Sequence, residues 1–179
     1  MAPAQPRSDQ RYQAAALVAG QIILLGAQVF LRRRSRPPDW PASIPVRVAT
    51  AGLAVGGSVV LVIGSSSLGR GLTISPLPNE RAQLRTDGLY GLARHPLYSG
   101  VIALSVARTL HSRDRRQAAL TAALILLLTG KSSFEEKALR QRFAEYPAYA
   151  AATPRFLPRP SVSGWRVRLC PRRVKAASR

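Results

Sequence analysis

Two long segments of the chain contain no charged residue, and each is long enough to cross a lipid bilayer. Gln13–Leu31 has 19 residues and Val48–Leu68 has 21. At 1.5 Å per residue in an α-helix they would extend about 28 Å and about 31 Å, close to the thickness of the hydrocarbon core. Two such segments in a chain of 179 residues are hard to reconcile with a soluble domain. The sequence therefore predicts an integral membrane protein built from α-helices.

Two shorter apolar runs, Leu97–Leu110 and Ala118–Thr129, are joined by a few polar residues and predict a tight helical hairpin. The sequence then becomes polar but keeps a helical spacing of apolar residues, so we expect the last helix to continue beyond the membrane until Pro147 breaks or kinks it. Gly52 and Gly56 have the GxxxG spacing that permits close helix approach. The predicted fold is an all-α integral membrane bundle of about four transmembrane helices with a C-terminal cytosolic helix.

The basic residues indicate the orientation of this bundle. The chain has 27 Lys and Arg against 8 Asp and Glu, a formal net charge of +19. With both termini in the cytoplasm, 18 of these cations lie on the cytoplasmic side and 9 on the other side, which agrees with the positive-inside rule. The cluster Arg32, Arg33, Arg34 and Arg36 opposes this orientation. The arginine-rich composition suggests a GC-rich bacterium, so we expect a plasma (bacterial inner) membrane location.

Polar and aromatic side chains gather around the stretch GLARHPLYSG, residues 91–100, just before the third apolar run. Four spans place Tyr90, Arg94, His95 and Tyr98 on the same side of the membrane as Glu135 and Glu136. Taken singly, each has an ordinary explanation as an interface anchor, a helix cap or a solvated glutamate. Taken together, they suit a zwitterionic cofactor with a sulfonium group, because carboxylates bind ammonium, cations bind carboxylate and aromatic rings hold the sulfonium.

Other familiar site motifs are missing from the sequence. It contains no GxGxxG after a strand, no GxxxxGK[ST] and no GxSxG. The single cysteine, Cys170, excludes an internal disulfide and a cysteine-based zinc site, and the two histidines lack metal-ligand companions. We therefore expect no metal, and we expect no nucleic acid partner.

Two separated motifs make the chain resemble the isoprenylcysteine carboxyl methyltransferase family and the related phospholipid methyltransferases. The first is LRTDGLYGLARHPLYSG at 84–100, and the second is FEEKALRQRFAEYPAYAAATPRFLP at 134–158. They occur in the right order around an apolar hairpin, and LGRGLTISPLP at 68–78 fits the bacterial members. The resemblance covers roughly residues 46–158. Leu89 stands where many members have proline, and Ala144 where many have glycine.

The resemblance implies an enzyme that binds S-adenosylmethionine at the cytoplasmic face and methylates an oxygen, nitrogen or sulfur of a lipid-like or isoprenoid acceptor. The residues it assigns to the cofactor are Tyr90, Arg94, His95, Pro96, Tyr98, Gly100, Glu135 and Glu136. Those it assigns to the acceptor are Tyr146, Tyr149 and Arg155. We expect the catalytic roles to fall to Arg94, Glu136 and Arg155. The sequence leaves open which of the two glutamates contacts the cofactor, the identity of the acceptor and the oligomeric state.

The chain accordingly divides into an N-terminal transmembrane helix and loop at 1–45, a methyltransferase core at 46–158 and a basic tail at 159–179. The tail suits either a disordered arm or a contact with anionic lipid head groups. Two other functions remain open. One is a membrane reductase of the steroid-reductase type, which would use NADPH. The other is a non-catalytic membrane protein that binds anionic lipid through the tail.

Overall fold

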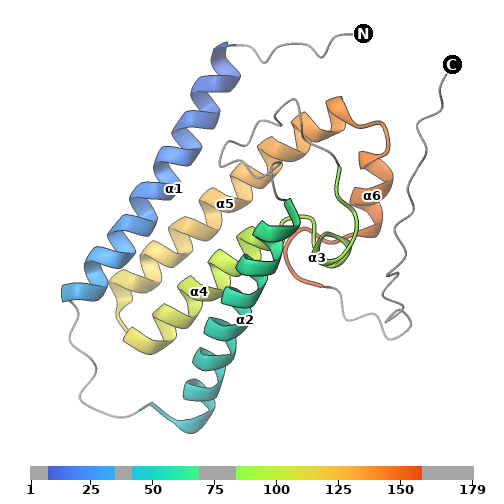
Figure 1. The fold of residues 1–179 in the computed structure, drawn as a ribbon. Helices are drawn as coiled ribbons and strands as arrows, with labels where there is room; N and C mark the ends of the chain where they lie inside the picture. The colour runs from blue at the N-terminus through green and yellow to red at the C-terminus, as the bar shows by residue number, and fades with distance from the viewer. Residues whose placement is uncertain (1–7, 35–41, 69–83, 159–179) are drawn as a thin grey trace, which may run out of the picture.

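The structure of the protein, a computed structural model, describes residues 8–34, 42–68 and 84–158. These residues form helices and no strand, so the predicted all-α class is confirmed for them. The elements are α1 Ser8–Arg34, α2 Ile44–Leu68, α3 Leu89–Leu92, α4 Pro96–Ser112, α5 Arg115–Arg142 and α6 Tyr146–Ala152 (Figure 1). The basic tail at 159–179 and nearly all of the stretch at 68–78 lie outside the described residues.

Three helices, α1, α2 and α5, are long and apolar enough to cross a bilayer, which indicates a membrane protein. The apolar side chains of α1 and α2 largely face outward, as lipid-facing side chains do: Ile23 and Phe30 on α1 and Val48 and Val62 on α2 are all more than half exposed. The third predicted span, Leu97–Leu110, corresponds to α4. Its 17 residues extend about 26 Å, less than the hydrocarbon core, and it is not among the three.

The predicted helical hairpin is formed by α4 and α5, with α2 packed along α4 and α1 along α5 (Figure 1). Its turn is short because Arg113 takes a left-handed conformation, with φ 50°, and ends α4. Asp114 then caps α5 by accepting a hydrogen bond from the amide of Arg116 at 2.8 Å. Thr109 and Thr121 join the two helices at 2.9 Å between their hydroxyl oxygens.

Two glycines allow α2 and α4 to approach closely, and they are not the pair that the GxxxG spacing predicted. A Cβ atom built on Gly100 would lie 2.9 Å from the carbonyl oxygen of Gly57, and one on Gly57 would lie 3.0 Å from the carbonyl oxygen of Gly100. Gly52 and Gly56 have no such neighbour within 4 Å. The helix contact depends instead on Gly57 and Gly100, because a side chain at either would press on the opposite backbone.

The helix α1 packs on α5, and two polar contacts join the two helices. Gln117 donates to the side-chain oxygen of Gln28 at 3.0 Å, and Lys131 donates to that of Gln21 at 2.7 Å. Gly20 lets the side chain of Leu127 approach α1 closely, since a Cβ at Gly20 would lie 2.7 Å from Leu127 Cδ1. Inside an apolar bundle, contacts of this kind help to fix the register of one helix on another.

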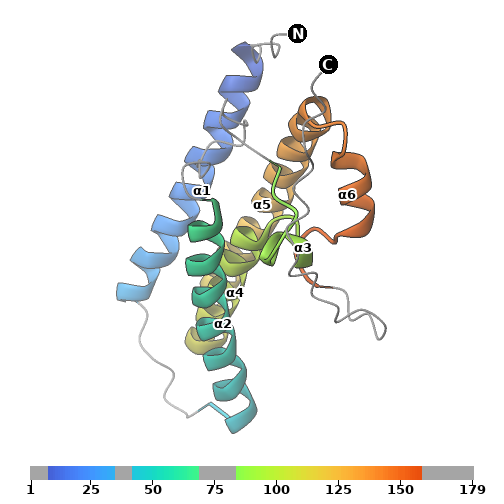
Figure 2. The same cartoon turned by 45° about the vertical axis from the view of Figure 1, so that its right-hand side comes forward.

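One end of the bundle carries the segments that precede α4 and follow α5. The helix α5 has 28 residues, about 42 Å, so its last turns extend beyond a bilayer core. It continues beyond its apolar part, as predicted, but it ends at Arg142, and Pro147 lies in the first turn of α6 rather than at a kink. Figures 1 and 2 show α3 and α6 beside this end of α5.

The contact between α2 and α4 gives a first prediction. Gly100→Ala should lower the free energy of unfolding by about 1–3 kcal/mol, because the new methyl group meets backbone that cannot rotate away. The thermal unfolding midpoint in detergent micelles measures this. Gly52→Ala is the matched control, since a methyl group at Gly52 meets no atom within 4 Å. An equal midpoint for the two variants would contradict the role of Gly100.

Candidate functional site

The segment that leads into α4 lies beside the segment that follows α6, and the two are joined through their backbones. The amide of Arg94 donates to the carbonyl of Pro154 at 2.9 Å, and the amide of His95 donates to that of Arg155 at 3.0 Å. Pro96 then begins α4, where its missing N–H is not needed. These hydrogen bonds join residues 60 positions apart in the chain, so the two sequence motifs are adjacent in space.

Glu136 lies at the centre of the cluster that these segments form. Its Oε1 atom is 3.0 Å from Nη2 of Arg94 and 3.0 Å from Nε of Arg155, and its Oε2 atom accepts from Nη2 of Arg155 at 3.1 Å. Nε2 of His95 lies 3.3 Å from Oε1. The side chain of Glu136 is only 7% exposed. A carboxylate so buried remains charged because two guanidinium groups neutralise it and donate hydrogen bonds to it.

Arg94 joins Glu136 to α6. Its Nη1 atom donates to the backbone carbonyls of Ala150 and Thr153, at the C-terminal end of that helix. Helix C-termini carry carbonyls without helical partners and a partial negative charge, so a cation is favourable there. From the sequence we expected Arg94 to bind a cofactor carboxylate or to order the loop that leads into α4. The structure places its guanidinium between Glu136 and α6, where protein oxygens surround it.

Glu135 belongs to the same cluster but is more accessible. The hydroxyl of Tyr98 donates to its Oε1 atom, and Nδ1 of His95 lies 3.4 Å from its Oε2 atom. Its side chain is 18% exposed, more than twice the value for Glu136. The rings of His95 and Tyr98 are stacked, with centroids 5.4 Å apart. The two neighbouring glutamates therefore have different surroundings, which sequence alone did not distinguish.

His95 bridges the two glutamates, one with each ring nitrogen. Burial alone would lower the pKa of His95, but its hydrogen bonds with Glu135 and Glu136 and their negative charges raise that pKa above the ordinary 6.5. The protonated imidazolium is therefore favoured in the folded protein. In that form both nitrogens donate, one to each carboxylate.

Three tyrosines surround the arginine side of the cluster. The hydroxyl of Tyr149 donates to the backbone carbonyl of Tyr90 at 2.6 Å, and the rings of Tyr149 and Tyr146 form a T-shaped pair with centroids 5.8 Å apart. The hydroxyls of Tyr90 and Tyr146 are buried and have no hydrogen-bond partner among the residues that the structure describes. Burial raises the pKa of each to about 12, so both hydroxyls remain neutral donors near pH 7. Buried hydroxyls of this kind call for a water or a ligand.

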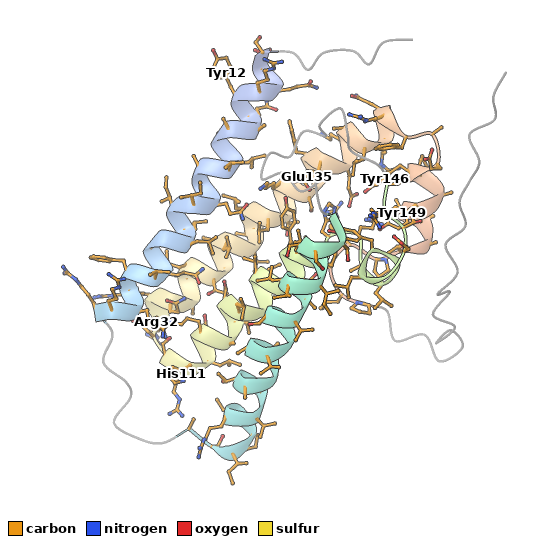
Figure 3. The ribbon with its side chains drawn as sticks, viewed as in Figure 1. Tyr12, Arg32, His111, Glu135, Tyr146 and Tyr149 are labelled. Atoms are coloured by element: carbon orange, nitrogen blue, oxygen red, sulfur yellow. The ribbon has the colours of Figure 1, made fainter. Side chains whose placement is uncertain are left out.

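The structure brings most of the predicted site residues together. Those in one hydrogen-bonded cluster are Arg94, His95, Tyr98, Glu135, Glu136 and Arg155. The three tyrosines adjoin it, whereas Pro96 begins α4 and Gly100 packs against α2. Figure 3 shows Glu135, Tyr146 and Tyr149 near one end of the bundle, and the second histidine, His111, near the other end with Arg32.

Sequence reasoning missed two residues of the cluster, Lys131 and Ser133. Nζ of Lys131 lies 5.4 Å from the centroid of the Tyr98 ring, and Nη1 of Arg155 donates to the hydroxyl of Ser133 at 3.1 Å. Lys131 stands four residues before Glu135, so both lie on one face of α5. That spacing, together with a cation placed directly after an apolar run, was the available signal.

Comparisons of the chain with protein-family models, with curated proteins and with solved structures found no match. Within the ranges that the structure describes, no three His, Cys, Asp or Glu side chains are placed to hold a metal ion.

The central position of Glu136 gives a second prediction. Glu136→Gln should destabilise the folded state by about 3–5 kcal/mol, because two buried guanidinium groups lose their countercharge. Amide hydrogen exchange should quicken at Arg94 and His95, whose amides bond to the segment after α6. Glu145→Gln makes the same change at an exposed site and should alter neither measurement. Unchanged exchange at Arg94 and His95 would show that Glu136 does not hold the segments together.

The raised pKa of His95 gives a third prediction. A group whose pKa is raised by folding contributes stability below its unfolded pKa and loses that contribution as pH rises through the folded pKa. The thermal midpoint should therefore fall as pH is raised from about 6.5 through the higher folded value. His95→Gln should flatten this dependence, whereas His111→Gln should retain it. An equal slope in the wild type and His95→Gln would contradict the assignment.

Proposed function

We propose that the protein is a membrane methyltransferase that transfers the methyl group of S-adenosylmethionine to a lipid-like or isoprenoid acceptor. The observation that carries this proposal is the meeting of the two motifs in one buried cluster at the end of a helical bundle. Within it, Glu135 remains partly exposed beside aromatic side chains. The resemblance to the isoprenylcysteine carboxyl methyltransferase family supports the same activity.

The residues of the cluster fit the chemical groups of this cofactor. A partly exposed carboxylate suits its ammonium group, and Glu135 is such a carboxylate. The buried, unpaired hydroxyls of Tyr90 and Tyr146 suit its ring nitrogens and sugar hydroxyls. The edges and faces of tyrosine rings suit its sulfonium and adenine. We assign the cofactor to Glu135 rather than Glu136, because two arginines already neutralise Glu136.

The bound cofactor supplies an activated methyl group on a good leaving group. The protein would position the two reactants and exclude water from the site. Arg94 and Arg155 hold Glu136, and through it they fix α6 against the segment that leads into α4. His95 holds Glu135 and Glu136 at a set spacing. A donor site fixed in this way aligns the methyl group with an acceptor and excludes water from the reaction.

The membrane arrangement completes the proposal. We assign α4 as a fourth, short crossing and place both termini and the cluster on the cytoplasmic face of a bacterial inner membrane. The alternating directions of α1, α2, α4 and α5 support this placement (Figure 1), as does the excess of 18 cations over 9. The acceptor would then enter sideways from the bilayer, between apolar helix faces.

The proposed role of Glu135 gives a fourth prediction, which calorimetric titration of the purified protein in nanodiscs tests. The wild type should bind S-adenosylmethionine, and Glu135→Gln should weaken binding about tenfold or more, because the ammonium loses a charged hydrogen-bond partner. Glu145→Gln, an identical change at an exposed site, should bind as the wild type does. A folded wild type that binds NADPH and not S-adenosylmethionine would replace this proposal with the reductase.

A further inference from the structure

A buried lysine lies beside the proposed cofactor carboxylate and is joined to the first helix. Lys131 is 2% exposed, and its Nζ atom donates to the side-chain oxygen of Gln21 on α1 at 2.7 Å. The same atom lies 5.4 Å from the centroid of the Tyr98 ring. Tyr98 in turn donates its hydroxyl to Glu135, one turn beyond Lys131 on α5. A continuous set of contacts therefore runs from α1 to the site.

Burying an ammonium group inside a membrane helix bundle is costly, and such residues commonly mark a site that handles charge. The balance of basic and acidic side chains in the cluster supports a role for Lys131 in binding a charged group. The cluster contains three basic side chains, Arg94, Arg155 and Lys131, against the two carboxylates of Glu135 and Glu136. Protonation of His95, which the two glutamates favour, adds a further positive charge. A cluster with this positive excess is suited to accept a carboxylate from a ligand.

We propose that Lys131 binds a carboxylate of one of the two reactants, beside the ammonium group that Glu135 holds. This inference rests on the proposed function. A cation and a carboxylate one helical turn apart on α5 are complementary to the ammonium and carboxylate of an amino acid, which the cofactor carries at one end. The carboxylate head of an acidic acceptor is the other source of the same chemistry.

Gln21 is the positioning residue for Lys131. Its amide oxygen holds the ammonium group over Tyr98, so α1 contributes to ligand binding although it lies outside residues 46–158. The chain offers a matched comparison, because Gln28 makes the second amide contact between α1 and α5, with Gln117. Gln21 and Gln28 are thus glutamines of one helix that contact the same neighbouring helix, and only Gln21 contacts the cluster.

Two pairs of probes in nanodiscs test the proposal. The first pair is S-adenosylmethionine and its decarboxylated analogue. The second pair, titrated into protein saturated with S-adenosylhomocysteine, is farnesoic acid and farnesol. If Lys131 binds the cofactor carboxylate, Lys131→Met should weaken the binding of S-adenosylmethionine about tenfold or more and leave the binding of the decarboxylated analogue unchanged. If it binds the acceptor carboxylate, the variant should lose the preference for farnesoic acid over farnesol instead.

Lys131→Arg keeps the positive charge and should restore most of the affinity that Lys131→Met loses. Gln21→Leu should reduce the same affinity by a smaller factor, whereas Gln28→Leu should leave it unchanged. Lys131→Met that binds every probe as the wild type does would overturn this inference and leave the proposed function standing. A folded wild type that does not bind S-adenosylmethionine would overturn the proposed function, and the inference with it.

Discussion

The structure of the site depends on one buried carboxylate. Glu136 is held by Arg94 and Arg155, and these three residues come from three different segments of the chain. A charge buried at this depth is tolerated only when partners neutralise it. If the segments separated, buried charged groups would lose their partners, which costs free energy. The arginines also bond to carbonyls and a hydroxyl, which satisfies donors that Glu136 cannot reach. This closed set of contacts fixes α6, which has only seven residues, about two turns.

The arrangement also explains how two identical neighbouring residues can have different roles. Consecutive positions on a helix point about 100° apart, so Glu135 and Glu136 meet different elements. Glu136 faces the two arginines, whereas Glu135 faces Tyr98 and the side of the cluster with more exposure. His95 contacts both and transmits the fixed position of one to the other. The saturated carboxylate is thus structural, and it holds the more accessible carboxylate in position.

Sequence analysis predicted the features that depend on local composition. Apolar runs predicted α1, α2, α4 and α5 because helix formation in an apolar setting requires little more than length and hydrophobicity. The proximity of His95 to Glu135 and Glu136 followed from counting the helices between them. Contacts that depend on how far one helix slides along another were missed. The pairing of Gly57 with Gly100, the bond from Lys131 to Gln21 and the carbonyls around Arg94 are of this kind. No pattern in the separate segments encodes them.

The register of α1 on α5 is one such contact between helices, and it affects the site. Lipid tails are as apolar as the helix faces, so the hydrophobic effect gives α1 little reason to prefer one position along α5 over another. The amides of Gln21 and Gln28 and the close approach at Gly20 provide that preference. Gln21 accepts a hydrogen bond from Nζ of Lys131 at 2.7 Å. A shift of α1 by one turn would take the side-chain oxygen of Gln21 away from Lys131. Glu135 is the carboxylate one turn beyond Lys131 on the same face of α5. The position of α1, which sets where Lys131 is held, therefore affects the electrostatic environment of Glu135.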